Sequence, residues 1–136
     1  MADTVITLRL TLDDPVAGVR YSLQEDEAIF APVTATDAPL SFDVPVRLTD
    51  DGRFLGSFVR REGSKRRFVY IRIGQCAGQH GTELNRRAKI DIHDISPALL
   101  DQARQGRTLE IRLPGRGRDG TPACATVRSI TGWTAI

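Results

Sequence analysis

The sequence contains few of the residues that build disulfide frameworks or metal centres. Among its 136 residues are two cysteines and two histidines. Cys76 and Cys124 are too few for a disulfide framework, and each lies among small residues, where a free cysteine usually packs as a buried hydrophobe. One disulfide or a reactive thiol is the alternative. The spacing of Cys76, His80, His93 and Cys124 matches no zinc finger, so we expect no metal and no cofactor.

Long apolar runs are also missing. No stretch approaches the roughly 18 apolar residues that span a bilayer, and the start, MADTVITLRL, lacks the regions of a signal peptide. We therefore expect no membrane partner and a cytoplasmic location. Hydrophobic residues make up 40% of the chain and charged residues 26%, which argues against disorder. The length suits one domain, predicted to cover residues 1–136.

Net charge is only +2, but the charge is unevenly distributed along the chain. Residues 1–51 hold three basic and ten acidic side chains, a balance of −7. Residues 52–136 hold sixteen and seven, a balance of +9, and residues 52–89 alone hold ten and two. Such asymmetry indicates either attraction between the halves of one compact domain or a face that binds anions.

Alternation of apolar and polar residues is abundant, and its period is that of a β-strand. A proline cannot donate to a strand ladder, so the segment with Pro45 is expected to lie at a sheet edge or to bulge there, and such an edge would permit dimerisation. The alternating apolar positions are Ile6, Leu8, Leu10 and Leu12; Val19, Tyr21 and Leu23; Leu40, Phe42, Val44, Val46 and Leu48; Ile90 and Ile92; Leu109, Ile111 and Leu113; then Ala125, Val127 and Trp133.

One segment, about residues 97–105, has the signals of a helix. Ser96 is a good N-cap, Pro97 suits the first helical position, and Gly106 suits the C-terminal end. A helix this short is marginal alone, so its apolar side chains must pack on the sheet. These side chains are Leu99, Leu100 and Ala103.

Two turn signals, Asp51-Gly52 and Gly63-Ser64, predict a meander with strands over about 40–50, 53–62 and 65–73. Both faces of its last strand are apolar enough to be covered, which a β-barrel or a sandwich explains. The absence of βαβ order argues against a parallel sheet. The sequence therefore predicts a mainly β fold, an antiparallel β-barrel or sandwich of seven to nine strands with one short helix.

Two-residue turns would also fix the register of this meander. Counting outward from them places Asp50 opposite Arg53 and Leu55 opposite Arg72. Arg72 then shares a face with apolar residues, where a charge needs a partner or a ligand. Its planar guanidinium suits a carboxylate or phosphate, and the Tyr70 hydroxyl lies beside it. Pairing with an N-terminal acid, or extension to the rim of the sheet, is the structural alternative.

Two glycine-rich loops, residues 74–81 and 114–120, follow predicted strands. Glycines let backbone amides approach an anion, and the interleaved arginines add charge. Neither loop is a P-loop or a dinucleotide fingerprint, and tight turns between strands explain them equally well. The candidate ligand-binding residues are Tyr70, Arg72, Gln75, His80, Arg86, Arg87, Gly115, Arg116, Gly117 and Arg118.

The leading functional hypothesis is a non-enzymatic module that binds a small anionic ligand or an acidic partner. The binding surface would be a basic face that includes several of these arginines. One alternative is a small enzyme that uses His80 with Cys76 or Asp91. The other is weak nucleic-acid binding through the hairpin tip, residues 60–67. Arg61 would face Arg66 in that tip, and like charges across strands are unfavourable unless solvated or met by an anion. No residue is assigned as catalytic.

Several strings in the sequence are distinctive in combination. They are PVAGVRYSLQ (residues 15–24), FLGSFV (54–59), RFVYI (67–71) with Gly74, RRAKI (86–90) and the terminal Gly132-Trp133. On these strings, in this order, the chain resembles over nearly its whole length a family of small bacterial proteins catalogued as a domain of unknown function. The resemblance implies a bacterial, single-domain context and no particular activity.

Overall fold

The computed structural model describes the backbone of residues 4–25, 28–29, 33–55, 65–66, 68–77, 82–114 and 132–136, and within them the side chains of 4–23, 33–54, 91–114 and 132–136. These residues form a mainly β fold with one short α-helix, as predicted. Its elements are β1 (Thr4–Asp13), β2 (Arg20–Glu25), β3 (Ala28–Ile29), β4 (Val33–Thr34), β5 (Leu40–Leu48), β6 (Phe54–Leu55), β7 (Lys65–Arg66), β8 (Phe68–Ala77), β9 (Thr82–Asp91), the 3₁₀ helix η2 (Ile92–Asp94), α1 (Pro97–Arg104), β10 (Leu109–Pro114) and β11 (Thr134–Ala135).

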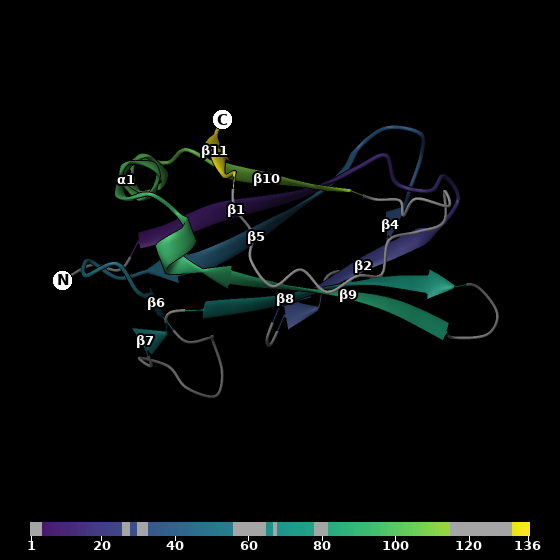
Figure 1. The fold of residues 1–136 in the computed structure, drawn as a ribbon, viewed down its shortest axis with the longest axis horizontal. Coiled ribbons are helices and arrows are strands. Elements are labelled where there is room, and N and C mark those ends of the chain that lie inside the picture. Colours follow the sequence, from purple (N-terminus) through teal and green to yellow (C-terminus); the bar gives the residue numbers. More distant parts are fainter. Residues whose placement is uncertain are drawn as a thin grey trace.

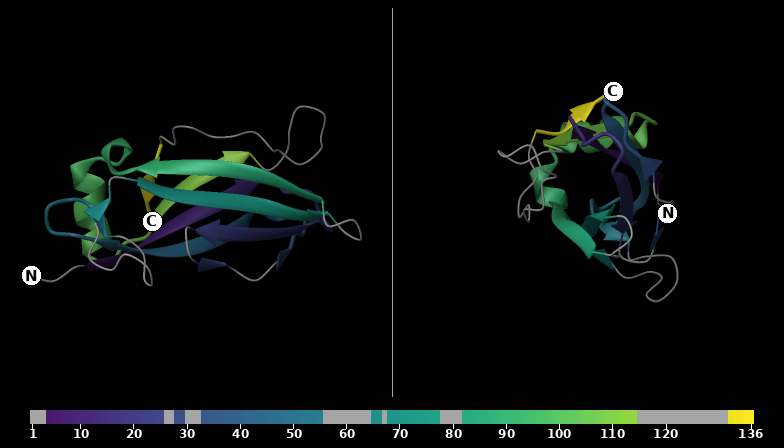
Figure 2. Two further views of the ribbon diagram at one scale, coloured as in Figure 1. Left: turned by 90° about the horizontal axis from the view of Figure 1, so that it is seen from below. Right: turned by 90° about the vertical axis from the view of Figure 1, so that its right-hand side faces the viewer.

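The strands form two sheets, and Figure 1 shows β1, β5 and β10 of one sheet above β8 and β9 of the other. One sheet has the order β11-β10-β1-β5-β6-β7, and the other has the order β3-β2-β8-β9, with β4 also paired to β2. The end-on view in Figure 2 shows the strands of both sheets around a shared interior. Each described strand pairs only within its own sheet, so no closed barrel is seen among the residues described.

The number of strands is larger than predicted because several are very short. Eleven strand segments are described, against seven to nine expected, and five of them (β3, β4, β6, β7 and β11) have two residues each. Two residues are too few to show a period of alternation. The long strands β1, β2, β5 and β10 lie where the apolar pattern predicts strands.

The sheet is also not wholly antiparallel. β1 pairs with β10 in parallel, with Leu8 opposite Leu109, whereas every other described strand pair is antiparallel. βαβ order marks parallel pairs between strands that follow one another along the chain. β1 and β10 lie near opposite ends of the chain, so their pairing leaves no such local signal.

β1 is the central strand of the core because it is paired on both sides. Its inward positions meet the inward positions of β5 on one side and of β10 on the other. The alternation read from the sequence is confirmed at each of these positions. The buried side chains are Ile6, Leu8, Leu10 and Leu12 on β1, Phe42, Val44, Val46 and Leu48 on β5, Leu109, Ile111 and Leu113 on β10, and Tyr21 and Leu23 on β2.

The position of Pro45 agrees only in part with the expectation of an edge or a bulge. Pro45 is exposed and lies opposite Thr7 of β1, in an unbroken register. β5 lies between β1 and β6 in the sheet, so it is not an edge strand. It pairs with β6 only at Leu48 in the described part of the chain, so Pro45 itself has no described strand partner on that side.

The helix forms where the cap signals place it. The Ser96 hydroxyl accepts a hydrogen bond from the Leu99 amide at 3.2 Å, and Pro97 begins the helix. Gly106 just beyond the end has a φ of +101°, a conformation that favours glycine. Leu100 and Ala103 are buried in the core cluster and Leu99 packs against it, so the predicted docking on the sheet is confirmed.

The turn at Asp51-Gly52 differs from the prediction by one residue. The Thr49 amide donates to the Arg53 carbonyl at 2.8 Å, and the Gly52 amide donates to the Thr49 carbonyl at 3.1 Å. The loop therefore has three residues, with Gly52 at φ +78° in the left-handed position of such a loop. Thr49, not Asp50, faces Arg53.

This one-residue shift reverses the predicted faces of the second strand. Leu48 now pairs with Phe54, and Phe54 is 1% exposed and belongs to the core. Partners in an antiparallel ladder share a face. Phe54 therefore lies on the core face with Leu48, whereas a two-residue turn would have set Leu55 opposite Leu48.

The rest of the predicted meander is wrong in register. Leu55 pairs with Lys65 and Phe54 with Arg66, so Leu55 does not face Arg72 and Arg61 does not face Arg66. The third strand, β8, leaves this sheet and pairs with β2 and β9. Residues 56–64, with the expected Gly63-Ser64 turn and most of the hairpin tip, lie outside the described residues. So do Ala125 and Val127.

Among the described residues, α1 is far shorter than a membrane-spanning helix, and no other helix is long and apolar enough to cross a membrane.

Candidate functional site

Arg72 lies in the middle of the second sheet, between two polar partners. The pairing of β8 places it opposite Gln24 of β2 on one side and opposite Arg87 of β9 on the other. Tyr70, two residues earlier on β8, lies opposite Lys89. Since partners across an antiparallel pair share a face, and residues i and i+2 also do, these positions belong to one face of the sheet.

The neighbouring residue Leu23 shows which face this is. Leu23 on β2 is 0% exposed and belongs to the core. Side chains alternate along a strand, so the position of Gln24, and with it that of Arg72, lies on the face turned away from the core. Arg20, four residues before Gln24 on the same face, is exposed. We call the positions of Arg20, Tyr70, Arg72, Arg87 and Lys89 the basic outer face.

The register divides the predicted ligand-binding residues between the two faces. Tyr70, Arg72 and Arg87 lie on the basic outer face. Gln75 pairs with Tyr21, and Arg86 pairs with Ile73, which itself pairs with Leu23, so these two lie at core-face positions. For these five residues the structure describes the backbone alone. Outside the described residues altogether are His80, Gly115, Arg116, Gly117 and Arg118.

Cys76 and Asp91, the two predicted alternatives for a catalytic partner of His80, lie far apart from each other. Cys76 pairs with Glu83 and Asp91 pairs with Phe68, at opposite ends of the β8–β9 ladder. That separation is about 26 Å, since each strand residue rises about 3.3 Å. The Asp91 carboxylate also has a structural role, because it accepts a hydrogen bond from the His93 amide at 2.9 Å and caps η2.

No metal site is seen in the part of the chain that the structure describes. No group of three or more histidine, cysteine, aspartate and glutamate side chains gathers there. His93 is exposed at η2, with its Nδ1 atom 4.0 Å from an Asp91 oxygen. The side chain of Cys76 and all of His80 and Cys124 lie outside the described residues.

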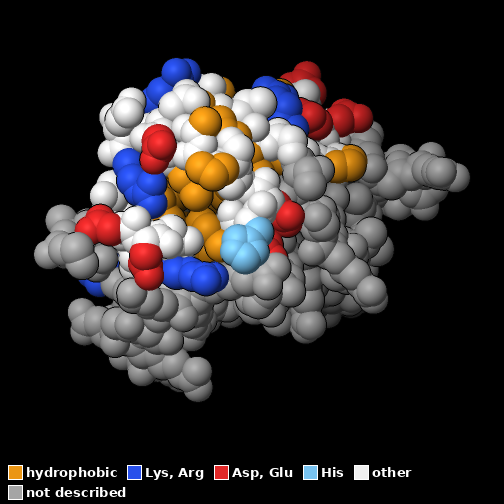
Figure 3. Space-filling view, turned by 60° about the vertical axis from the view of Figure 1, so that its left-hand side comes forward, with side chains coloured by type: hydrophobic (Ala, Val, Ile, Leu, Met, Phe, Trp, Pro, Cys, Tyr) orange, Lys and Arg blue, Asp and Glu red, His pale blue; other side chains and the backbone are white. Residues whose placement is uncertain are grey.

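A hollow of about 600 Å³ opens between the β5–β6 turn, η2 and α1. Figure 3 shows it as a patch of hydrophobic side chains bordered by basic, acidic and histidine side chains. Its floor consists of buried residues, Ile92, Ile95 and Leu100. The remaining lining residues are Asp50, Asp51, Gly52, Arg53, His93, Pro97, Asp101 and Arg104.

Arg104 and Thr49 connect the two walls of this hollow. Arg104 Nη1 donates to Asp101 Oδ1 at 2.9 Å within α1, and Nη2 donates to the Thr49 carbonyl at 3.2 Å across the hollow. The buried Thr49 hydroxyl accepts from the Arg53 amide at 3.0 Å and donates to Asp51. Hydrogen bonds therefore stabilise the turn internally and also connect it to the helix.

The sequence contains local signals for the β5–β6 turn and for the helix α1, but no signal that these two elements lie next to each other in the fold. The Asp51-Gly52 turn and the Ser96-Pro97 cap are both local patterns. Arg104 and Thr49 are 55 residues apart, and only the folded sheet brings them together. The hollow was therefore not among the predicted sites.

One comparison with known proteins gives a match. Residues 6–136 match the model of a family described as "Family of unknown function (DUF5990)". The chain belongs to this family. No curated protein and no solved structure matches the chain. The resemblance read from the sequence motifs is thus confirmed, and the family's description names no ligand, partner or reaction.

Ion pairs in this member of the family lie on the outer side of the first sheet. Arg9 of β1 donates to both carboxylate oxygens of Asp43 on β5, at 2.7 and 3.1 Å. Arg112 of β10 donates to Asp13 of β1, a bond between the basic and the acidic halves of the chain. This pair supports the structural interpretation of the charge asymmetry at one position.

The Arg9–Asp43 pair affects the ionisation of both groups. Hydrogen bonds from Arg9 hold the pKa of the Asp43 carboxyl below its ordinary value of 3.8, although partial burial acts in the opposite direction. The hydrogen bond to Asp43 raises the pKa of Arg9. A carboxyl whose pKa is lower in the folded than in the unfolded protein stabilises the fold above the unfolded value, and this stabilisation is lost as pH falls through the folded value.

Asp43→Asn is therefore expected to destabilise the protein slightly at pH 7 and by progressively less below about pH 4, where unfolded aspartates protonate. Thermal unfolding of wild type and of Asp43→Asn between pH 7 and pH 2 measures how the stabilities of the two proteins approach each other. The stability of Arg9→Gln should approach that of wild type in the same way. A difference between wild type and Asp43→Asn that stays constant through this range would contradict the assignment.

Proposed function

We propose that this protein is a non-enzymatic binding module whose basic outer face holds a small anionic ligand or an acidic partner. The supporting observation is the register that sets Arg72 directly opposite Arg87. Like charges in directly opposed cross-strand positions are unfavourable. An anion bound between them would offset that repulsion, and guanidinium groups are well suited to carboxylate and phosphate.

The charge of the rest of the face supports the same function. Lys89 lies opposite Tyr70, next to the Arg72–Arg87 pair, and Arg20 lies on the neighbouring strand. The acidic positions of the face in β8 and β9, Glu83 and Asp91, lie at the two ends of the ladder. The centre of the face therefore carries basic residues from the two adjacent strands β8 and β9 and a tyrosine that can add a hydroxyl donor, while Arg20 of β2 lies nearer one end, opposite Cys76.

A thermal-shift screen over nucleotides, phosphosugars and carboxylates tests this proposal. A ligand at 100 times its Kd stabilises a protein by about 2.7 kcal/mol, which gives a clear upward shift of Tm. We expect such a shift for wild type and its loss in the Arg72→Gln/Arg87→Gln double variant. The matched control is Arg9→Gln/Arg112→Gln, which removes the same charge from the other sheet and should keep the shift.

Two results would count against the proposal. One is the absence of stabilisation by any of these anions at millimolar concentration. The other is an equal shift in the Arg72→Gln/Arg87→Gln variant. Binding of DNA or RNA with an affinity that falls steeply with salt would favour the nucleic-acid alternative instead, for which Lys65 and Arg66 of β7 are the basic residues with described backbone.

A further inference from the structure

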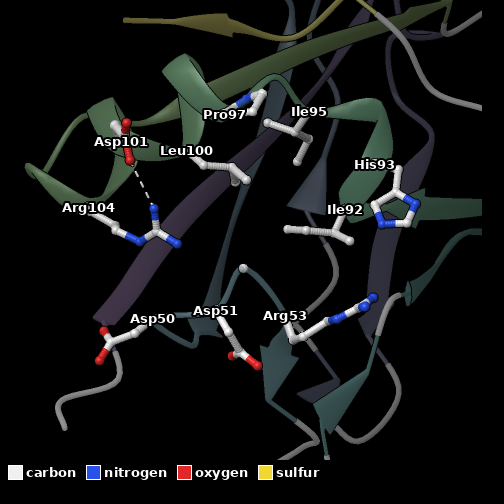
Figure 4. Close-up of a pocket in the computed structure, with 11 residues that line it drawn as sticks. Asp50, Asp51, Arg53, Ile92, His93, Ile95, Pro97, Leu100, Asp101 and Arg104 are labelled. Atoms are coloured by element: carbon white, nitrogen blue, oxygen red, sulfur yellow. Dashed lines mark hydrogen bonds and ion pairs between the residues drawn. The ribbon is translucent and has the colours of Figure 1, made fainter.

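The hollow beside α1 combines an apolar floor with a positively charged side. Ile92, Ile95 and Leu100 contribute the floor, and all three are buried members of the core cluster. Its volume of about 600 Å³ lies within the range of small-molecule sites in proteins. In Figure 4 the side chains of Ile92 and Leu100 point toward the space between α1 and the β5–β6 turn.

The two arginines of the hollow differ in their bonding. Arg104 already donates to Asp101 and to the Thr49 carbonyl, so its guanidinium is held in place at the side of the hollow. Arg53 is exposed, and its guanidinium makes no hydrogen bond or ion pair with any described residue. Its backbone is nevertheless fixed, because its amide donates to the Thr49 hydroxyl at 3.0 Å. Arg53 is thus a positioned cation with free donors.

The acidic groups near the hollow do not compete for Arg53. Asp101 is paired with Arg104, and Asp51 accepts a hydrogen bond from Thr49. In Figure 4 the carboxylates of Asp50 and Asp51 extend from the turn on the side away from α1. The Arg53 side chain extends away from Asp50, toward the imidazole of His93.

We propose that this hollow is a second binding site, for a small carboxylate with an apolar body. The carboxylate would bind to Arg53 with His93 beside it, and the apolar part would lie over the exposed Pro97 and the small surface that Leu100 leaves open to the hollow. A guanidinium with free donors suits a carboxylate, and the apolar part of the ligand gains by leaving water. This site is separate from the basic outer face and does not depend on it.

Three probes of related structure test both parts of the proposal. Octanoate has the carboxylate and the apolar chain, acetate has only the carboxylate, and octanol has only the chain. We expect saturable binding of octanoate to the wild-type protein by calorimetry. Octanol should bind at least about tenfold more weakly, the size of effect that a charge-assisted hydrogen bond gives. Acetate should also bind at least about tenfold more weakly, because it has no apolar chain to remove from water.

Variants assign the binding to the hollow. Arg53→Gln should weaken octanoate about tenfold and leave octanol unchanged. Arg107→Gln removes an arginine just beyond α1 that does not line the hollow, and it should bind octanoate as wild type does. The Arg72→Gln/Arg87→Gln variant should also retain octanoate binding, which separates this site from the proposed function.

Three outcomes would overturn the proposal. Octanol that binds as tightly as octanoate would indicate an apolar hollow with no role for the charge. Wild-type affinity in Arg53→Gln would exclude the assigned cation. No binding of octanoate at millimolar concentration would exclude the site.

Discussion

Replacing Leu8 with alanine is expected to lower the free energy of unfolding by about 2–5 kcal/mol, the range for a buried leucine that leaves a cavity. Leu8 is 0% exposed and lies on the central strand, opposite Val44 of β5 and Leu109 of β10. Backbone pairing on both sides limits how far the neighbours can move into the space. A cost near the upper end of the range is therefore expected.

Urea unfolding of wild type and Leu8→Ala measures this cost directly. The matched control is Val5→Ala on the same strand, where the side chain is 61% exposed, and the expected change is within about 0.5 kcal/mol. Equal and small effects for both variants would mean that β1 is not the centre of the core.

Replacing Thr49 with valine is expected to cost about 1–3 kcal/mol, because the change keeps the shape and removes a buried hydrogen-bonding group. The Thr49 side chain is buried. Its hydroxyl accepts from the Arg53 amide at 3.0 Å and donates to Asp51. Without this hydroxyl, the Arg53 amide loses its acceptor, and the three-residue turn loses its side-chain hydrogen bonds.

Thr49→Ser tests whether the hydroxyl is responsible. Serine retains the hydroxyl, so most of the stability should return, and the comparison by urea unfolding isolates the hydrogen bonds from the volume of the side chain. The valine variant should also bind octanoate more weakly, because Thr49 positions Arg53. A Thr49→Val protein as stable as wild type would contradict the hydrogen-bonding scheme of the turn.

Local patterns predicted the elements that depend on local physics. β1, β5 and β10 alternate because one face of each packs in the core, with Thr11 of β1 as a buried exception. α1 begins at Pro97 because the Ser96 side chain caps it and accepts from the Leu99 amide. Such signals lie within a few residues of one another and need no knowledge of the partner strand.

Register and pairing were not predictable in the same way. Asp-Gly suits a two-residue turn, but a glycine in a left-handed conformation also ends a three-residue loop, and the Thr49 hydroxyl favours the latter here. The shift of one residue moved Phe54 to the core face. The sequence likewise carried no signal that β8 would pair with β2, or that β1 would pair with β10, because those contacts are distant along the chain.

The candidate site could be predicted from the sequence only in part. The excess of basic residues over 52–89 was evident from the sequence, and Arg72 is one of them. The predicted register placed Arg72 among apolar residues, whereas the pairing with Gln24 and Arg87 puts its position on the outer face. Arg72 is therefore not at the position of a buried charge but at an outer-face position directly opposite Arg87.

The central claim is that the basic outer face binds an anion, and one titration tests it most directly. Backbone amide NMR spectra of isotope-labelled wild-type protein would be recorded during addition of inorganic pyrophosphate. We predict saturable shifts concentrated in β2, β8 and β9 around Arg20, Arg72 and Arg87. Spectra that stay unchanged to millimolar pyrophosphate, or shifts confined to the sheet that contains β1, would contradict the claim.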